Sequence, residues 1–144
     1  MLGRYLTKSL DETKQLAAKF AKEVSIGKVI ALIGELGTGK TAFTQGFAKA
    51  MGIKEAVGSP TFKLISEYEG VKFRLYHIDC YRLKNAQQFI NIGGEDYLAP
   101  ICGVTLIEWA DIIKEILPND TIMINFKRII GKSNQREIII SNNS

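Results

Sequence analysis

The chain has 144 residues, 46% of them hydrophobic, so we expect a single domain over residues 1–144 with one core. No segment approaches the roughly 18 apolar residues that span a membrane, and the charged N-terminus lacks the apolar run of a secretory signal. Cys80 and Cys102 have neither metal-ligand nor C-x-x-C spacing, which together with an ATP-type motif described below favours reduced thiols in the cytoplasm. We expect no membrane contact. The net charge of +4 lies at the two ends of the chain, since residues 29–118 carry nine basic and ten acidic groups.

The first predicted element is a helix over about 10–25. Ser9 and Glu12 have the capping-box form, in which each side chain accepts a hydrogen bond from the other residue's backbone. Apolar residues follow at the spacing of one helical face, and Gly27 comes after this pattern. The sequence therefore predicts an amphipathic helix with a defined start and an end near Gly27.

A buried strand and a second helix are predicted next. Residues 29–33 are all apolar and include a valine and two isoleucines, the pattern of a central strand covered on both faces. Phe43, Phe47 and Met51 recur on one face of a helix, and Gly52 is suited to end it. A strand, a loop and a helix therefore follow one another before Gly52.

The loop between these elements has the pattern G-x-x-x-x-G-K-[ST] of a phosphate-binding loop. Its residues are Gly34, Glu35, Leu36, Gly37, Thr38, Gly39, Lys40 and Thr41. The glycines allow backbone N–H groups to turn toward phosphate oxygens, and the following helix adds the positive end of its dipole. We expect Lys40 to be solvent-facing until it meets the β- and γ-phosphates of a nucleotide, and the Thr41 hydroxyl to bind Mg²⁺. The alternative is a glycine-rich turn that contains Lys-Thr by chance.

The second half of the chain favours hairpins and short helices. Pro60 breaks the chain, and extended stretches over about 63–68 and 71–79 flank Glu69-Gly70 as an antiparallel hairpin. The remaining predicted elements are short helices within 84–98, a buried strand over 104–107, a short helix over 110–116, a strand through 122–126, a basic turn over 127–136, a returning strand over 137–141 and a disordered tail over about 141–144. Strands that first alternate with helices and then form hairpins predict an α/β three-layer P-loop NTPase fold, with a mixed sheet, helices on both faces and antiparallel hairpins. A phosphate site in such a sheet is expected at the C-terminal ends of the central parallel strands.

Two carboxylates stand where a metal ion and an attacking water would be organised. Glu108 ends the apolar strand over 104–107, and Asp79 ends the second strand of the hairpin. Both are candidates, because a Mg-nucleotide site needs acidic groups at strand ends. The alternatives are a turn or cap role for Asp79 and a helix-start charge for Glu108.

Each of four further features allows two interpretations. His77 alternates onto the same side as Asp79 and is more often structural than catalytic in such a position. Thr61 is either a plain turn residue or a group that approaches the γ-phosphate. Arg82 is either an internal arginine finger or a partner in a surface ion pair. The basic segment forms either a solvated hairpin or a docking face for an acidic surface or tRNA, and its residues are Lys127, Arg128, Lys132 and Arg136.

These motifs together point to one family. The chain resembles the TsaE family, formerly YjeE, in the order and spacing of four blocks: the loop 34–41, Ser59-Pro60-Thr61-Phe62, His77-Ile78-Asp79-Cys80-Tyr81-Arg82 and Glu108-Trp109. The resemblance covers about Ser9 to Pro118. The loop is common to many families, whereas the other three blocks together are much more specific.

The resemblance implies a small Mg-dependent ATPase, weak alone and dependent on partners, that is required for threonylcarbamoyl-adenosine beside the tRNA anticodon. The implied partners are the TsaD and TsaB proteins, with tRNA contacted indirectly or at the edge of the assembly. The implied cofactors are ATP or ADP with Mg²⁺. The implied catalytic residues are Lys40, Asp79 and Glu108, the metal ligands Thr41 and Glu108, and the switch-like loop Ser59, Pro60 and Thr61. The implied nucleotide contacts are the loop residues 34–41, Ala42 and Trp109, with Leu10 and Thr13 near the adenine.

Two other functions remain open from the residues alone. One is a small-molecule kinase on a P-loop fold, which needs an acceptor pocket and usually an arginine-rich lid, whereas the five arginines here are scattered. The other is a nucleotide-gated binding module with negligible hydrolysis. Steady phosphate release without an acceptor, stimulated by partners, distinguishes the ATPase from both.

Overall fold

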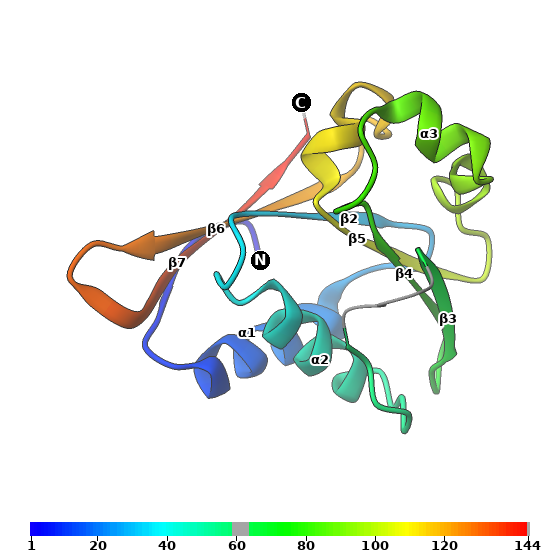
Figure 1. Ribbon diagram of the computed structural model, residues 1–144. Helices are drawn as coiled ribbons and strands as arrows, with labels where there is room; N and C mark the ends of the chain where they lie inside the picture. The colour runs from blue at the N-terminus through cyan, green and yellow to red at the C-terminus, as the bar shows by residue number, and fades with distance from the viewer. Residues whose placement is uncertain (59–63, 144) are drawn as a thin grey trace.

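The protein is built around one seven-stranded sheet with helices on both faces (Figure 1). The computed structural model describes residues 1–58 and 64–143. The strands are β1 (Gly3–Thr7), β2 (Val29–Ile33), β3 (Ile65–Glu69), β4 (Arg74–Asp79), β5 (Gly103–Glu108), β6 (Ile122–Ile129) and β7 (Lys132–Asn142). The helices are α1 (Leu10–Glu23), α2 (Lys40–Ala50), the short α3 (Ala86–Asn91) and the 3-10 helices η1 (Gly94–Tyr97) and η2 (Ala110–Ile116). No helix in these described ranges is long and apolar enough to cross a membrane.

The sheet has the order β1-β7-β6-β2-β5-β4-β3 and is mixed. β2 pairs in parallel with β5 and β6, and β4 pairs in parallel with β5. β3–β4 and β6–β7 are antiparallel hairpins, and β1 pairs antiparallel with β7. The predicted mixed α/β sheet with antiparallel hairpins is therefore confirmed, and the parallel strands β2, β5 and β4 end at one edge.

α1 begins at the predicted cap. Ser9 Oγ accepts a hydrogen bond from the Glu12 N–H at 3.1 Å, and Glu12 Oε1 accepts one from the N–H of Lys8 at 3.0 Å. The helix ends at Glu23, slightly before the expected end, because Val24 has an extended conformation. The start of α1 is thus determined by local side-chain chemistry.

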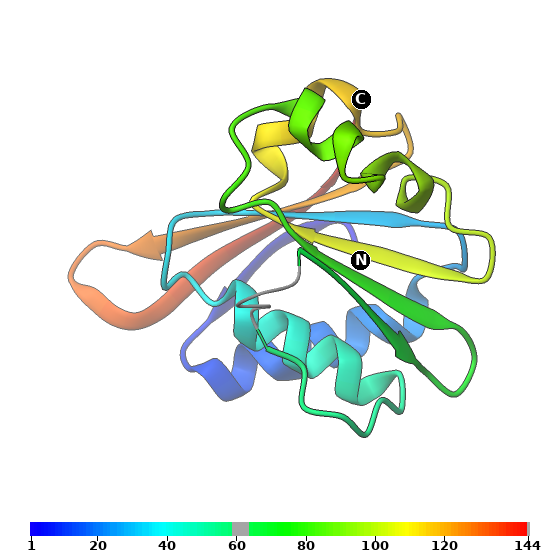
Figure 2. The same cartoon turned by 45° about the vertical axis from the view of Figure 1, so that its right-hand side comes forward.

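α1 and α2 lie side by side against one face of the sheet (Figures 1 and 2). The core between them is aromatic, with ring centroids 5.6 to 6.0 Å apart among Phe20, Phe43, Phe47 and Phe126. Gly46 permits the close helix approach, since a Cβ at this position would lie 2.4 Å from the Lys14 carbonyl oxygen. α1 and α2 are therefore packed closely against each other over the sheet.

α3 and η2 cover the other face of the sheet (Figure 2). Phe89 of α3 and Ile113 of η2 are fully buried against a cluster that includes Ile78 of β4 and Ile107 of β5. All six residues of β5 are buried, because both of its faces are covered. The prediction of a doubly buried strand before Glu108 is confirmed.

The N-terminal strand is a correction, because the sequence pattern did not predict β1. This strand is short and lies at the edge of the sheet, where Arg4 and Leu6 are exposed. A half-exposed edge strand of five residues lacks the continuous apolar run that predicts a central one. Its pairing with β7 is a property of the assembled sheet.

The C-terminal region carries two further corrections. The turn of the last hairpin is Ile130-Gly131 and not the whole segment 127–136, since the β6–β7 pairing extends to Ile129 and Lys132. The tail is not disordered through residue 143: Ser141 and Asn142 pair with β6, and the Asn143 N–H donates to the Thr121 carbonyl at 2.9 Å. Backbone groups make these bonds, so polar side chains do not prevent the pairing.

Candidate functional site

A cavity of about 1100 Å³ opens at the C-terminal ends of β2, β4 and β5. Its wall is formed by the loop 34–41, the first turns of α1 and α2, the ends of β4 and β5 and two residues of β7. In open α/β sheets, ligands bind in the crevice at the carboxyl ends of the parallel strands. The cavity therefore stands where the topology favours a ligand site.

Lys40 was expected to face the solvent, but the structure buries it: only 4% of the residue is exposed. Its Nζ donates to the Gly34 carbonyl oxygen and lies 3.5 Å from the centroid of the Trp109 ring. Burial lowers the pKa of Lys40, although the nearby carboxylates Glu108, Asp111 and Asp79 act in the opposite direction. The expectation was wrong because the loop carbonyl and the indole face together hold the ammonium group.

The loop 34–41 contributes only part of its residues to the cavity wall. Gly34 packs beneath the wall, where a Cβ would lie 2.8 Å from the Phe126 carbonyl oxygen. Thr38 is buried and donates through Oγ1 to the Glu35 carbonyl at 2.6 Å. The wall residues from this segment and the start of α2 are Leu36, Gly37, Gly39, Lys40, Thr41 and Ala42.

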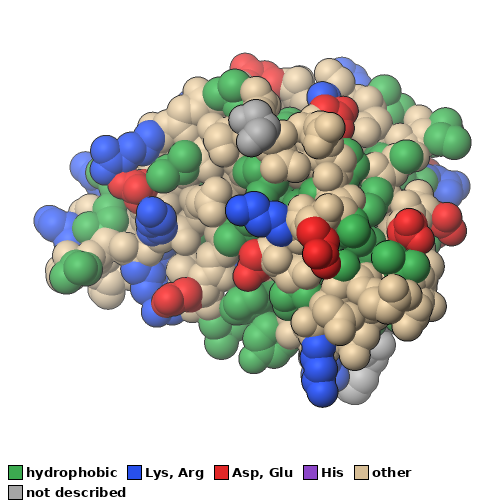
Figure 3. All heavy atoms as spheres, turned by 90° about the horizontal axis from the view of Figure 1, so that it is seen from above, with side chains coloured by type: hydrophobic (Ala, Val, Ile, Leu, Met, Phe, Trp, Pro, Cys, Tyr) green, Lys and Arg blue, Asp and Glu red, His purple; other side chains and the backbone are tan. Residues whose placement is uncertain are grey.

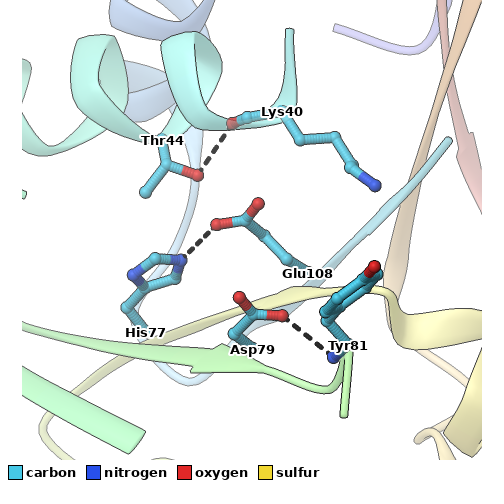
Figure 4. Close-up of polar contacts among 6 residues, drawn as sticks. All are labelled: Lys40, Thr44, His77, Asp79, Tyr81 and Glu108. Atoms are coloured by element: carbon cyan, nitrogen blue, oxygen red, sulfur yellow. Dashed lines mark hydrogen bonds and ion pairs between the residues drawn. The ribbon is translucent and has the colours of Figure 1, made fainter. Parts of the chain in front are cut away.

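The two candidate carboxylates lie side by side. Asp79 is opposite Glu108 in the β4–β5 register, and both line the cavity. Figure 4 shows them below Lys40, with His77 reaching Glu108 from β4. Asp79 Oδ1 accepts a hydrogen bond from the Tyr81 N–H at 2.9 Å, so Asp79 stabilises a turn as well as lining the cavity. Burial raises the pKa of Asp79 above its usual value, and the charge of Glu108 acts in the same direction.

His77 lies beneath the cavity and does not line it. Its Nε2 is 2.6 Å from Glu108 Oε2, and both side chains are almost fully buried. The contact holds one oxygen of the Glu108 carboxylate and so orients the group from behind. This position agrees with the structural interpretation of His77.

Trp109 has a left-handed backbone with φ of 57°, and no other non-glycine residue among 1–58 and 64–143 has a positive φ. This conformation costs about 1–2 kcal/mol for an L-residue. It begins η2 directly after Glu108, and the indole contacts both Lys40 and Tyr81, whose ring centroid is 5.0 Å away. Such strain tends to occur at functional sites, where surrounding contacts maintain it.

Thr41 and Glu108 could hold a divalent cation between the start of α2 and the end of β5. Both line the cavity, and both offer the oxygen donors that Mg²⁺ prefers. No group of three or more His, Cys, Asp or Glu side chains in the described ranges could hold a metal alone. The donor set fits Mg²⁺, which is usually bound by one or two protein oxygens together with phosphate oxygens and water.

Of the two residues expected near an adenine, only one lines the cavity. Leu10 lines the cavity, whereas Thr13 is fully buried with its hydroxyl 2.9 Å from that of Thr7. Ser59, Pro60 and Thr61 lie outside the described residues. Sequence reasoning missed Gln45, although it follows Thr41 by one helical turn. It also missed Asn134 as a wall residue, for which the sequence carries no local signal.

Two basic side chains of the last hairpin make contacts that neither interpretation predicted. Figure 3 shows Lys and Arg side chains gathered at the end of the molecule where the β6–β7 hairpin projects. However, Arg128 donates to the Leu36 carbonyl and Arg136 to the Gly37 carbonyl. These two arginines therefore contact the loop 34–41. Arg82 lines the cavity and forms no ion pair with the described residues.

Comparison with known proteins identifies relatives along almost the whole chain. The family described as "Threonylcarbamoyl adenosine biosynthesis protein TsaE" matches residues 7–138. The tRNA threonylcarbamoyladenosine biosynthesis protein TsaE of Bacillus subtilis is 40% identical over 135 residues, which cover 94% of this chain and 82% of that protein. The protein of the same name from Treponema pallidum is 35% identical over 138 residues, which cover 96% and 99%.

A solved structure supports the same assignment. The crystal structure of YdiB from Bacillus subtilis matches with a TM-score of 0.78 and 35% sequence identity, covering 100% of this chain and 88% of that chain. The family match continues past Pro118 into β6 and β7, beyond the last sequence block that carried the resemblance. The chain therefore belongs to the TsaE family.

Proposed function

We propose that this protein is the ATP-binding and ATP-hydrolysing subunit required for threonylcarbamoyl-adenosine modification of tRNA next to the anticodon, acting with the TsaD and TsaB proteins. Membership of the TsaE family supports the place in tRNA threonylcarbamoyladenosine biosynthesis. The observation that carries the ATPase is the single cavity that brings together the loop 34–41, Lys40, Asp79 and Glu108.

Lys40 is the group that changes partner when nucleotide binds. Its ammonium leaves the Gly34 carbonyl and the Trp109 ring and moves to the oxygens of the β- and γ-phosphates. The backbone N–H groups of the loop and of the first turn of α2 bind the same phosphates. Burial lowers the pKa of Lys40 because the ammonium group loses hydration, and a phosphate would offset that loss with an opposite charge.

Thr41 and Glu108 hold the metal in this proposal. Mg²⁺, when bound, neutralises charge on the β- and γ-phosphates. His77 keeps one Glu108 oxygen engaged and so limits the carboxylate to one orientation toward the cavity. Asp79 positions the attacking water, and its raised pKa brings the carboxylate closer to the range in which it can accept a proton.

Phosphate release tests the proposal. The assay measures inorganic phosphate from Mg-ATP with the chain alone, with TsaD and TsaB, and without any acceptor, using Lys40→Ala as the control. We expect slow release by the chain alone and a clear stimulation by the partners. Binding of ATP without release under either condition would support a binding module, and transfer of phosphate to an added small molecule would support a kinase.

A further inference from the structure

The carbonyl groups of residues 34–37 in the loop 34–41 all accept hydrogen bonds from side chains. A phosphate-binding loop must turn its N–H groups inward, so its carbonyl groups need partners elsewhere. Four consecutive carbonyls are satisfied: Gly34 by Lys40 Nζ, Glu35 by Thr38 Oγ1, Leu36 by Arg128 Nη2 and Gly37 by Arg136 Nη2. The first two donors belong to the loop motif, whereas the two arginines come from the β6–β7 hairpin.

The two arginines lie opposite each other in the β6–β7 register. Like charges directly across a pair of strands are normally destabilising. Here each guanidinium instead reaches a separate carbonyl at the apex of the loop. Arg136 Nη2 is 3.1 Å from the Gly37 oxygen, and its Nη1 also donates to Ser133 at 2.7 Å and Gln135 at 2.8 Å. The hairpin backbone therefore fixes the direction of the Arg136 guanidinium.

Binding of a nucleotide, as proposed above, would remove Lys40 from the Gly34 carbonyl. The bonds from Arg128 and Arg136 go to the Leu36 and Gly37 carbonyls and do not involve Lys40, so this exchange need not break them. They would then be the restraints from outside the motif that keep the apex carbonyls turned away from the phosphates. The arginines also place two positive charges near a site for a polyanion.

We propose that Arg128 and Arg136 are positioning residues that hold the loop 34–41 in the form that binds phosphate. The proposal rests on the nucleotide-binding function proposed above and adds a role that the sequence motif does not contain. The same hairpin offers a matched control, because Lys127 and Lys132 are exposed and make no hydrogen bond to a loop carbonyl in the described structure.

The test compares wild-type protein with two double variants of equal charge, Arg128→Gln/Arg136→Gln and Lys127→Gln/Lys132→Gln. Hydrogen exchange is measured on the backbone amides of residues 35–39 without nucleotide, and Mg-ADP affinity is measured by calorimetry. We expect the arginine variant to exchange these amides about tenfold faster and to bind Mg-ADP about tenfold more weakly. The lysine variant should match wild type in both measurements.

A single variant guards against a general loss of structure. Arg128 is exposed, so Arg128→Gln should fold, with normal exchange in the β6–β7 ladder but faster exchange in the loop. Arg128→Lys, which keeps a donor and a charge, should restore most of the slow exchange. Equal changes in the arginine and lysine double variants would overturn the proposal, because the effect would then arise from overall charge.

Unchanged loop exchange in every arginine variant would overturn the proposal as well. The proposed nucleotide function fails separately, if the wild-type protein does not bind Mg-ADP at all. In that case the exchange measurement without nucleotide still decides whether the arginines hold the loop.

Discussion

At the edge where the parallel strands end, the two faces of the sheet carry different kinds of side chain. One face is covered by α1 and α2, and the other by α3 and η2. Along β5, Val104, Leu106 and Glu108 face α1 and α2, whereas Ile107 faces α3 and η2. Along β4, His77 and Asp79 take the first side and Ile78 the second. A single period-two alternation thus brings the candidate chemical groups together under α2.

The other side contains no comparable group among the described residues. The buried side chains Lys40, His77 and Glu108 lie on the α1–α2 side. On the opposite side the buried polar Thr105 donates to the Tyr97 carbonyl, and the Cys80 thiol lies within the apolar cluster. The buried part of the α3–η2 side therefore consists mainly of packed apolar side chains. Substitutions on the two sides should separate stability from ligand binding.

The largest effect is expected from Lys40→Ala, on the α1–α2 side. ATP turnover should fall about 10³-fold or more, the scale of a lost charge on a transferring phosphoryl group. The fold should survive, since burial already disfavours the ammonium form and lowers the Lys40 pKa. Phosphate release and thermal unfolding measure the two effects, and wild-type turnover in the variant would contradict the assignment.

Phe89→Ala should show the opposite behaviour on the α3–η2 side. Phe89 is fully buried, so its truncation should lower the free energy of unfolding by about 3–5 kcal/mol. The Mg-ADP affinity of the folded protein should stay unchanged. Phe43→Ala is the matched control, because Phe43 is equally buried but lies in the first turn of α2, two residues after the loop 34–41. We expect it to lower both quantities, and equal binding losses in the two variants would remove the distinction between the sides.

The two carboxylates on the α1–α2 side should have separable effects. Glu108→Gln should raise the Mg²⁺ concentration needed for nucleotide binding about tenfold, because a metal ligand loses its charge. Asp79→Asn should reduce turnover more than affinity, because the position of the water matters in the transition state. Calorimetry at several Mg²⁺ concentrations and steady-state kinetics distinguish them. A turnover loss without a Mg²⁺ effect in Glu108→Gln, together with the reverse in Asp79→Asn, would exchange their roles.

A spectroscopic change should report ligand binding at the same edge. Trp109 is the only tryptophan, and Lys40 Nζ lies 3.5 Å from its ring centroid. Movement of Lys40 to a phosphate should alter the surroundings of the indole and change its fluorescence in a saturable way. Titration with Mg-ADP measures this, and Lys40→Ala should lose the response at the same concentrations. If protein that binds ADP by calorimetry shows no fluorescence change, Trp109 is remote from the site or insensitive to it.

The smallest effect concerns Cys80, which lies in the apolar cluster of the α3–η2 side. Burial raises the pKa of the Cys80 thiol to about 12, so the neutral thiol contributes stability below its ordinary pKa. That contribution is lost as the pH rises from the ordinary value toward about 12. Near pH 8, iodoacetamide should label exposed Cys102 and leave Cys80 intact, as mass spectrometry would show. Equal labelling of both thiols would contradict the burial.

The sequence by itself determined the elements whose signals are local. The cap at Ser9, the apolar run of β2 and the loop 34–41 depend on neighbouring residues, and the structure has each of these elements where the pattern predicts it. The positions of Asp79 and Glu108 at the ends of predicted strands also indicated that both carboxylates belong to the site. Side-chain period and strand direction are sufficient for such inferences.

Only the tertiary structure decided the contacts between distant segments. Arg128 and Arg136 are separated from their carbonyl partners by 92 and 99 residues, so no local pattern could connect them with the loop. The pairing of β1 with β7 and the burial of Lys40 against Trp109 have the same origin. In each case the two partners lie far apart in the sequence and come within contact distance only after the sheet has formed.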